Sequence, residues 1–385
     1  MSDGIIDELR SESFDPHLQK QLERRYTITQ AAEMVGRTTA AIRNAEKAGA
    51  LPHPEVTDTG RRAGYSLGAI NVMREHFGTR PGRARGEEPI VLAIQNFKGG
   101  VGKSTVCTHL SQFLAERGYR VLVIDCDSQA STTTTFGFRP DSDLTENDTL
   151  LPYFMHGGRE TLDYAIRQTY WDGLDIIPAN LTLYSSEYEL AAKAGMDGAG
   201  WLYRLRDGIG TVRDRYDVIL MDPPPALGMI SLNVLRAANS LIVPTPPAMI
   251  DYHSTVTFLR MLEDVLESVE KQLGEPVNYK FLKILVSKFD EGKSAQIGIA
   301  RLMRNVYQRY VLNAPLRVSA EIDNAGADWK TVYELNQPTT SSHVHRRCLK
   351  SFNAVCREIE IEIRSTWPSH REAVEEAGYP IDQVV

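Results

Sequence analysis

Lys98-Gly99-Gly100-Val101-Gly102-Lys103-Ser104-Thr105 is the stretch that decides the expected fold. It follows a short apolar run at 90–94 and precedes a segment with the apolar periodicity of a helix. A strand, a glycine-rich loop and a helix in this order predict a phosphate-binding loop. Glycines let backbone N–H groups approach phosphate oxygens closely, and the N-terminus of the next helix adds partial positive charge.

Two side chains of this loop carry the expected chemistry. Lys103 is expected to reach the β- and γ-phosphates, and Ser104 to bind Mg²⁺. The generic pattern G-x-x-x-x-G-K-[ST] does not fit fully, because its first glycine falls on Phe97. A second lysine, Lys98, stands beside the glycines instead. The expected nucleotide contacts are Lys98, Gly99, Gly100, Val101, Gly102, Lys103, Ser104 and Thr105.

Three further motifs follow apolar runs later in the chain. The first is Asp125-Cys126-Asp127-Ser128-Gln129, and the second is Asp222-Pro223-Pro224-Pro225 after the run 218–221. The third is Val243-Pro244-Thr245-Pro246-Pro247, which is followed by Asp251 and Ser254-Thr255. Four such motifs in this order are a much more specific signal than one phosphate loop.

From about residue 90 onward the chain resembles the ParA/MinD family of deviant Walker A ATPases, and most closely its plasmid partition members. The segment 125–129 is similar to the first switch of the family, D-x-D-P-Q, with Ser128 in place of the usual proline. Asp222 resembles the Walker B aspartate and begins a D-x-P-P second switch. The resemblance implies ATP and ADP as ligands, Mg²⁺ as the metal, and ATP hydrolysis.

The same resemblance implies a role for each site residue. Asp127 would position the attacking water, Asp125 would lie on the magnesium side, and Asp222 would sense the metal through a water molecule. Lys98 would cross a homodimer interface to the nucleotide of the partner. The resulting catalytic set is Lys98, Lys103 and Asp127; the metal set is Ser104, Asp125 and Asp222; Asp222 and Pro246 join the loop as nucleotide contacts.

The composition fits a globular protein without a membrane span. Of 385 residues, 42% are hydrophobic and 24% are charged, which leaves room for one large α/β domain and a small one. No run approaches the roughly 18 apolar residues of a membrane span, and the N-terminus is too acidic for a signal peptide. A cytoplasmic protein is expected. The four cysteines form no C-x-x-C pair, which argues against a metal or disulfide framework.

Charge is distributed unevenly along the chain. The net charge is −7, but the segment 20–86 holds 12 Lys and Arg against 6 Asp and Glu. The remainder holds 31 basic against 44 acidic residues. A basic segment on an acidic protein suggests one DNA-binding module, although a solvated surface gives the same count.

The segment 26–51 has the pattern of a helix-turn-helix. Thr29 can cap a first helix, Gly36 can form the turn, and Thr38 or Thr39 can cap a second helix. Arg and Asn side chains can address guanine and adenine edges with paired hydrogen bonds. A wing tip at 58–62 would follow, in an order that resembles the MerR-type winged helix-turn-helix. The expected DNA contacts are Thr39, Arg43, Asn44 and Lys47 from the second helix, with Arg61 and Arg62 from the wing.

The chain therefore divides into four expected parts. Residues 1–25 are expected to form an amphipathic helix, either packed on its own domain or acting as a dimerisation arm. Residues 26–77 form the winged helix-turn-helix domain, and 78–89 a linker rich in Gly and Arg that could also touch DNA phosphates. Residues 90–385 form an α/β ATPase domain with a doubly wound, mostly parallel sheet. Its expected strands are 90–95, 121–125, 174–178, 218–221, 240–243 and 280–287.

The function expected from these parts is ATP-dependent DNA segregation. ATP would drive a dimer that binds nonspecific nucleoid DNA, a ParB-like centromere-binding partner would stimulate hydrolysis, and the first domain would repress the protein's own operator. A nucleotide-sensing repressor is one alternative. A MinD-like membrane ATPase is another, but it requires a basic amphipathic C-terminal helix, and the segment 358–362 is acidic. A reductase of the nitrogenase-iron-protein type requires cluster cysteines that this chain does not supply.

Overall fold

A seven-stranded sheet forms the centre of the molecule in the computed structural model, which describes residues 20–54, 56, 62–196, 200–274, 276 and 278–376. The strand order is β3-β4-β2-β5-β1-β6-β7. Only the edge pair β3 and β4 runs antiparallel, and all other neighbours are parallel. The strands are β1 (Ile90–Ile94), β2 (Val121–Asp125), β3 (Arg167–Gln168), β4 (Leu174–Ile177), β5 (Val218–Asp222), β6 (Ser240–Thr245) and β7 (Phe281–Val286).

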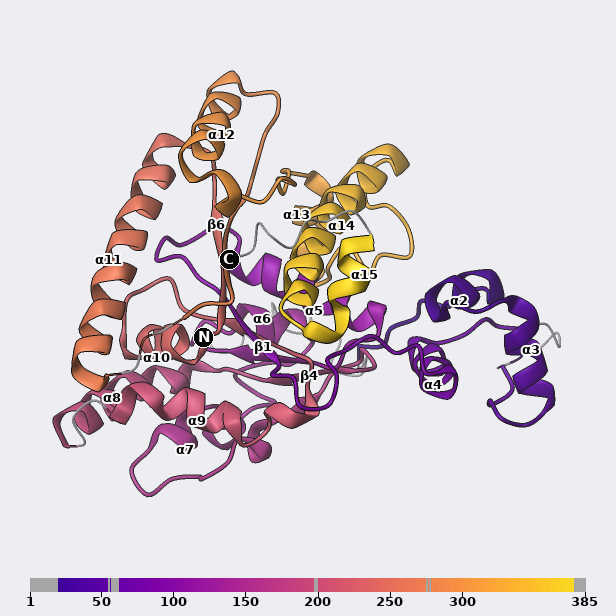
Figure 1. Cartoon of the computed structure of the whole chain (residues 1–385), viewed down its shortest axis with the longest axis horizontal. Helices are drawn as coiled ribbons and strands as arrows, with labels where there is room; N and C mark the ends of the chain where they lie inside the picture. The colour runs from indigo at the N-terminus through magenta and orange to yellow at the C-terminus, as the bar shows by residue number, and fades with distance from the viewer. Residues whose placement is uncertain are drawn as a thin grey trace, which may run out of the picture.

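Helices cover both faces of this sheet (Figure 1). The doubly wound α/β architecture and the six predicted strands are confirmed. The two-residue strand β3 was not predicted, because it has no apolar run. The helices are α2 (Ile28–Val35), α3 (Thr39–Lys47), α4 (Leu67–Phe77), α5 (Lys103–Arg117), α6 (Ser131–Thr135), α7 (Leu151–Phe154), α8 (Ser185–Met196), α9 (Arg204–Gly210), α10 (Met229–Ala237), α11 (Met249–Leu273), α12 (Ser294–Tyr307), α13 (Ala320–Ala327), α14 (Ser342–Ser365) and α15 (Arg371–Glu376).

Alternation along the strands divides the core into two layers. In β1, Leu92 packs with α5 and α14 on one face, while Val91 and Ala93 pack with α8 to α12 on the other. All five residues of β1, β2 and β5 are buried. Strands buried on both faces read as continuous apolar runs, which is why the sequence pattern located them.

The N-terminal helices α2, α3 and α4 lie together at one side of the α/β part (Figure 1). Thr27, rather than the predicted Thr29, caps α2, because Thr27 and Gln30 form a reciprocal capping box. Thr38, one of the two predicted caps, caps α3, and Gly36 makes the turn at φ 67°. The apolar residues of these helices join the same hydrophobic cluster as α5 and α14, so this module is packed against the sheet layer.

The segment before α2 is not helical where the structure describes it. Residues 20–25 of the predicted helix 1–25 are irregular, and residues 1–19 lie outside the described residues. Lys20 explains the difference: its Nζ donates to the carbonyls of Thr135 and Trp329 at 2.6 and 2.5 Å and pairs with Glu334 at 3.0 Å. These tertiary contacts hold the chain on the ATPase domain, and they override the local helical pattern.

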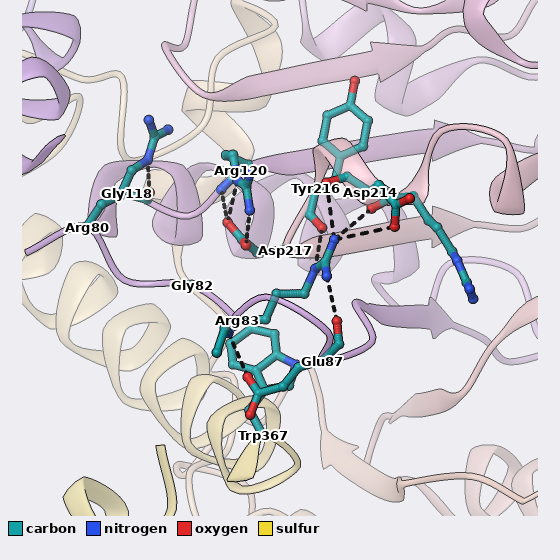
Figure 2. A network of polar contacts seen from close by, with 12 residues as sticks. Arg80, Gly82, Arg83, Glu87, Gly118, Arg120, Asp214, Tyr216, Asp217 and Trp367 are labelled. Carbon is teal, nitrogen blue, oxygen red and sulfur yellow. Dashed lines mark hydrogen bonds and ion pairs between the residues drawn. The ribbon is translucent and has the colours of Figure 1, made fainter. Parts of the chain in front are cut away.

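The predicted linker 78–89 is hydrogen-bonded to the ATPase domain. Figure 2 shows the guanidinium group of Arg83 directed at Tyr216 and Asp214; its Nε donates to the carbonyl of Tyr216 at 3.1 Å. The side chain of Arg83 is only 10% exposed. Arg80 likewise donates Nε–H to the carbonyl of Gly118 at 2.9 Å. These two arginines therefore make contacts within the protein, and contact of the linker with DNA phosphates stays a prediction.

Across the described ranges, every helix is too short or too polar to span a lipid bilayer.

Candidate functional site

The phosphate loop connects β1 to α5 in the predicted way. Gly100 and Gly102 have φ of 72° and 99°, a region that favours glycine, and Gly102 is the residue before α5. Ser287, at the end of β7, donates its hydroxyl to the carbonyl of Val101 at 2.8 Å. Asn96 accepts the backbone N–H of Lys98 at 3.1 Å. Side chains that follow β1 and β7 thus fix the conformation of the loop.

Lys103 lies at the start of α5 with its charge poorly compensated. The residue is only 7% exposed, and its Nζ makes one long hydrogen bond, 3.5 Å to the carbonyl of Lys98. Burial lowers the pKa of Lys103, while the nearby carboxylates of Asp222 and Asp127 oppose that effect. A buried cation of this kind at a helix N-terminus suits a phosphate group.

Two buried carboxylates stand side by side at the ends of β2 and β5. Asp125 and Asp222 are partners in the parallel register. Asp125 Oδ2 accepts from the N–H and hydroxyl of Thr133 at 2.9 and 2.7 Å, and its Oδ1 accepts the N–H of Asp127 at 3.1 Å. Burial and the charge of Asp222 raise the pKa of Asp125. Asp125 therefore braces the first switch, and its expected place beside the metal stays a prediction.

Asp222 keeps one oxygen available. Its Oδ2 accepts the hydroxyl of Thr132 at 2.7 Å, whereas Oδ1 is buried and has no partner within the described part of the chain. Burial raises the pKa of Asp222, and the hydrogen bond from Thr132 and the neighbouring hydroxyl of Ser104 oppose the rise. An orphaned carboxylate oxygen beside a serine hydroxyl fits Mg²⁺ or its bound water, because this hard cation prefers oxygen ligands. The described residues contain no cluster of three His, Cys, Asp or Glu side chains that would form a closed metal cage.

Asp127 lies on a tight turn that faces the loop. Its Oδ1 accepts the N–H of Gln129 at 3.0 Å, and its carbonyl accepts the N–H of Ala130 at 2.8 Å. Ala130 has φ 54°, a left-handed conformation that is costly for a residue with a Cβ. The switch is therefore kept in shape by its hydrogen bonds, although Ser128 replaces the proline of the family pattern.

Lys98 makes an ion pair within its own chain. Its Nζ lies 2.5 Å from Asp251 Oδ1, at the start of α11, and its side chain is one-third exposed. Pro246 follows β6 directly, on the strand next to β1, and is partly buried. The predicted site residues from the four motifs thus meet at one edge of the sheet, where open α/β sheets bind ligands. Contact of Pro246 with nucleotide stays a prediction.

Several residues of the site were not found from sequence. Thr132 and Thr133 belong to α6, whose run of four threonines has no apolar period and was given no role. Asn96 and Ser287 each follow a strand, like the aspartates that were identified. Their place directly after an apolar run was the available signal, but Asn and Ser are common at such ends and gave no reason to select them.

Three of the predicted DNA contacts are presented to solvent. Arg43, Asn44 and Lys47 are exposed on α3, and Thr39 at its start is partly exposed. Arg62 is different, because it pairs with the buried Glu46 at 3.1 Å and donates to the hydroxyl of Tyr65 at 2.9 Å. Arg62 thus stabilises the base of the predicted wing with half of its side chain exposed. Arg61 lies outside the described residues.

Known proteins resemble this chain over most of its length. Residues 90–274 match a family model described as an AAA domain. Protein SopA of Escherichia coli K12 is 38% identical over 349 residues, which cover 88% of each chain. The chromosome partitioning protein ParA of Caulobacter vibrioides is 30% identical over 244 residues, covering 63% of this chain and 85% of ParA.

Solved structures agree in fold. A structure described as a partition protein has a TM-score of 0.67 at 23% identity and covers 94% of this chain and 96% of its own. Cobyrinic acid a,c-diamide synthase from Mycobacterium smegmatis, with a bound ATP analog and magnesium, has a TM-score of 0.51 at 29% identity. The match covers 63% of this chain and 91% of the synthase chain. Together with the identity to SopA, the loop, the two switches and the paired aspartates identify an ATPase. The chain belongs to the ParA-type family of partition ATPases.

Proposed function

We propose that this protein segregates DNA by an ATP-driven cycle of dimerisation and DNA binding, acts on the nucleoid of a bacterial cell, and represses its own operator. The carrying observation is that Lys103, Asp222 and Asp127 converge at one edge of the sheet with Lys98 beside them. That arrangement supports ATP hydrolysis. The similarity to the chromosome partitioning protein ParA, together with the long match to SopA, supports DNA segregation as the process that uses it.

ATP and ADP are the proposed ligands, with Mg²⁺ as the metal. The loop N–H groups and Lys103 would bind the β- and γ-phosphates, while Ser104 and Asp222 would bind Mg²⁺ or its water ligands. Mg²⁺ supplies neutralisation of phosphate charge when it is bound. Asp127 would orient the attacking water, since its Oδ2 is not used by the hydrogen bond to Gln129. The solved diamide synthase with ATP analog and magnesium supports this choice of ligands.

Lys98 would act in trans. Within one chain, Lys103 alone is expected to bind the β- and γ-phosphates, so a second lysine beside the loop has no necessary role there. After release from Asp251, Lys98 could reach the nucleotide of a second copy, as an arginine finger does. Dimer formation and hydrolysis would then depend on the same side chain. Stimulation by a ParB-like partner, proposed from the family, would act on this dimer.

Operator binding is proposed for α3. Its exposed Arg43 and Asn44 have the donors and acceptors that read bases, and Lys47 can contact phosphate. The helix α2, the turn at Gly36 and α3 follow one another as in a helix-turn-helix. Binding to nonspecific DNA would use other surfaces of the ATP-bound dimer.

Co-sedimentation with DNA tests this function. The protein is mixed with nonspecific DNA, or with DNA from the upstream region of its own gene, in the presence of ATP, ADP or no nucleotide. The proposal expects nonspecific binding only with ATP and sequence-specific binding with ADP or without nucleotide. Sequence-specific binding in every state, with no ATP-dependent nonspecific binding, would favour a nucleotide-sensing repressor instead.

A further inference from the structure

A second cavity lies far from the phosphate loop, between the N-terminal module and the ATPase domain. It has a volume of roughly 600 Å³ and is walled by α2, α4, the C-terminal end of α5 and α14. The phosphate loop is at the other end of α5, whose 15 residues span about 22 Å. This cavity is therefore separate from the nucleotide site, and its volume is in the range of small-molecule sites.

Basic side chains dominate the wall of this cavity. Five arginines line it against three glutamates: Arg24, Arg74, Arg117, Arg357 and Arg364 against Glu33, Glu116 and Glu360. Two of the glutamates are already engaged. Glu116 pairs with Arg24 at 3.0 Å and Glu360 with Arg117 at 3.3 Å, and each also accepts a tyrosine hydroxyl.

Three guanidinium groups keep donors to spare. Arg117 uses only Nε toward Glu360, and Arg364 uses only Nε toward His370 at 3.1 Å, in the contacts recorded for the described residues. Arg357 is exposed and has no recorded partner among those residues. Arg357 and Arg364 are seven residues apart on α14, so they lie on the same face, two turns apart.

Two neutral groups point to the same kind of ligand. The hydroxyl oxygen of Thr79 lines the cavity, is buried, and has no partner in the described part of the chain. Asn353 accepts the hydroxyl of Tyr333 at 2.9 Å through Oδ1, which leaves its amide donor available. The buried Arg74 adds to the positive potential of the cavity. Burial and the charges of Arg117 and Arg80 lower its pKa to about 10, so the side chain stays protonated at neutral pH.

We propose that this cavity binds a small anion with two or more phosphate groups, held by Arg117, Arg357 and Arg364. Guanidinium groups bind phosphate through paired, charge-assisted hydrogen bonds, and the long side chains of Arg357 and Arg364 can converge on one ligand across the roughly 10 Å of helix between them. Such a ligand would bridge α14 and α5, the helix that follows the phosphate loop. A partly open hollow of roughly 600 Å³ has the size of a site for a free polyphosphate, whereas a DNA duplex could reach it only from its open side.

Isothermal titration calorimetry with inorganic pyrophosphate tests this site. The full chain carries Lys103→Ala, so that the phosphate loop does not contribute, and is compared with the same chain that also carries Arg357→Gln. We expect binding by the first protein and at least about tenfold weaker binding by the second, the effect of losing one charge-assisted contact. The matched control is Arg347→Gln, an exposed arginine of α14 outside the cavity, which should change affinity less than about twofold.

The titration is repeated with the parent chain saturated with ADP, which occupies the phosphate loop. The result therefore does not depend on how well Lys103→Ala folds. No pyrophosphate binding in either protein would overturn the proposal. Equal losses from Arg357→Gln and Arg347→Gln would also overturn it, since net charge alone would then explain the effect. Displacement of pyrophosphate by a short DNA duplex, lost with Arg357→Gln, would identify DNA as the phosphate source and contradict a small ligand.

Discussion

Lys98 and Asp251 form an ion pair of 2.5 Å within one chain. Asp251 belongs to the segment after β6 that resembles plasmid partition ATPases, so the pair joins two of the four sequence motifs. The pair is partly exposed, and exposed ion pairs contribute little to stability. Lys98 can therefore exchange its partner Asp251 for a stronger anion, such as a nucleotide phosphate, at small cost.

The hydrogen bond from Thr132 to Asp222 should support both stability and metal binding. Thr132→Val keeps the shape of the side chain but leaves both oxygens of a buried carboxylate short of donors. We expect the free energy of unfolding to fall by about 1–3 kcal/mol and Mg²⁺-dependent hydrolysis to weaken. Denaturant unfolding and a steady-state ATPase assay measure the two effects. Thr135→Val is the control, since that hydroxyl is exposed and bonds only to the backbone of α6; equal losses from both would contradict the role of Thr132.

Lys20 should anchor the N-terminal segment. It is mostly buried and contacts the carbonyl of Thr135 at the end of the switch helix, so Lys20→Met removes several charge-assisted bonds at once. A loss of about 1–3 kcal/mol in unfolding free energy is expected. Lys271→Met, which removes an exposed pair with Glu267, should cost under about 0.5 kcal/mol. Indistinguishable denaturation midpoints for the two variants would show that the anchor contributes nothing.

Acid should release Thr339 and Thr340, which precede α14 and donate their N–H and hydroxyl groups to the buried Glu321. Burial would raise the pKa of this carboxyl, but hydrogen bonds from Thr340, Thr339 and His345 outweigh that effect and lower the pKa to about 2. The unfolded value is near 4.3, so the contribution is complete above that pH and is lost as the pH falls toward 2. Urea unfolding from pH 5 to 3 should show this loss, and Glu321→Gln should flatten it. An unchanged pH profile in that variant would contradict the assignment.

The exposed face of α3 should set sequence specificity. Arg43→Ala with Asn44→Ala should abolish operator binding but spare ATP-dependent binding to nonspecific DNA, because base contacts specify while phosphate contacts position. Each lost base contact is worth about 1–3 kcal/mol. Electrophoretic mobility shifts measure both activities. Arg85→Ala, an exposed arginine of the linker, controls for lost charge; if nonspecific binding falls together with operator binding, the two surfaces are not separate.

The sequence was most informative where each strand is buried on both faces. β1, β2 and β5 are continuous apolar runs, and a polar motif follows each one directly, so both the sheet and the edge that binds nucleotide could be predicted. Asp222 and the loop that carries Lys103 were selected because each follows such a run, and their contacts with nucleotide and metal stay predictions.

Contacts between distant segments could not be predicted in this way. The residues 20–25 carry a helical pattern, but Lys20 binds groups more than a hundred residues away, and the pattern did not decide the outcome. Arg83 has the composition of a flexible basic linker, yet it is held by backbone carbonyls of the ATPase domain. The threonines of α6 were missed because hydroxyl groups that brace buried carboxylates leave no periodic signal.

Sedimentation velocity of the Lys98→Ala variant tests the central claim, that the nucleotide site is completed by a lysine from a second copy. The parent protein and the variant are compared with ADP and with a nonhydrolysable ATP analogue, after a titration has established that each binds nucleotide. We predict that the parent forms a dimer only with the ATP analogue, and that the variant binds nucleotide as a monomer but does not dimerise. Its hydrolysis rate should fall by about 10³- to 10⁵-fold, the usual effect of losing such a cation. Normal ATP-dependent dimerisation of Lys98→Ala would contradict the claim.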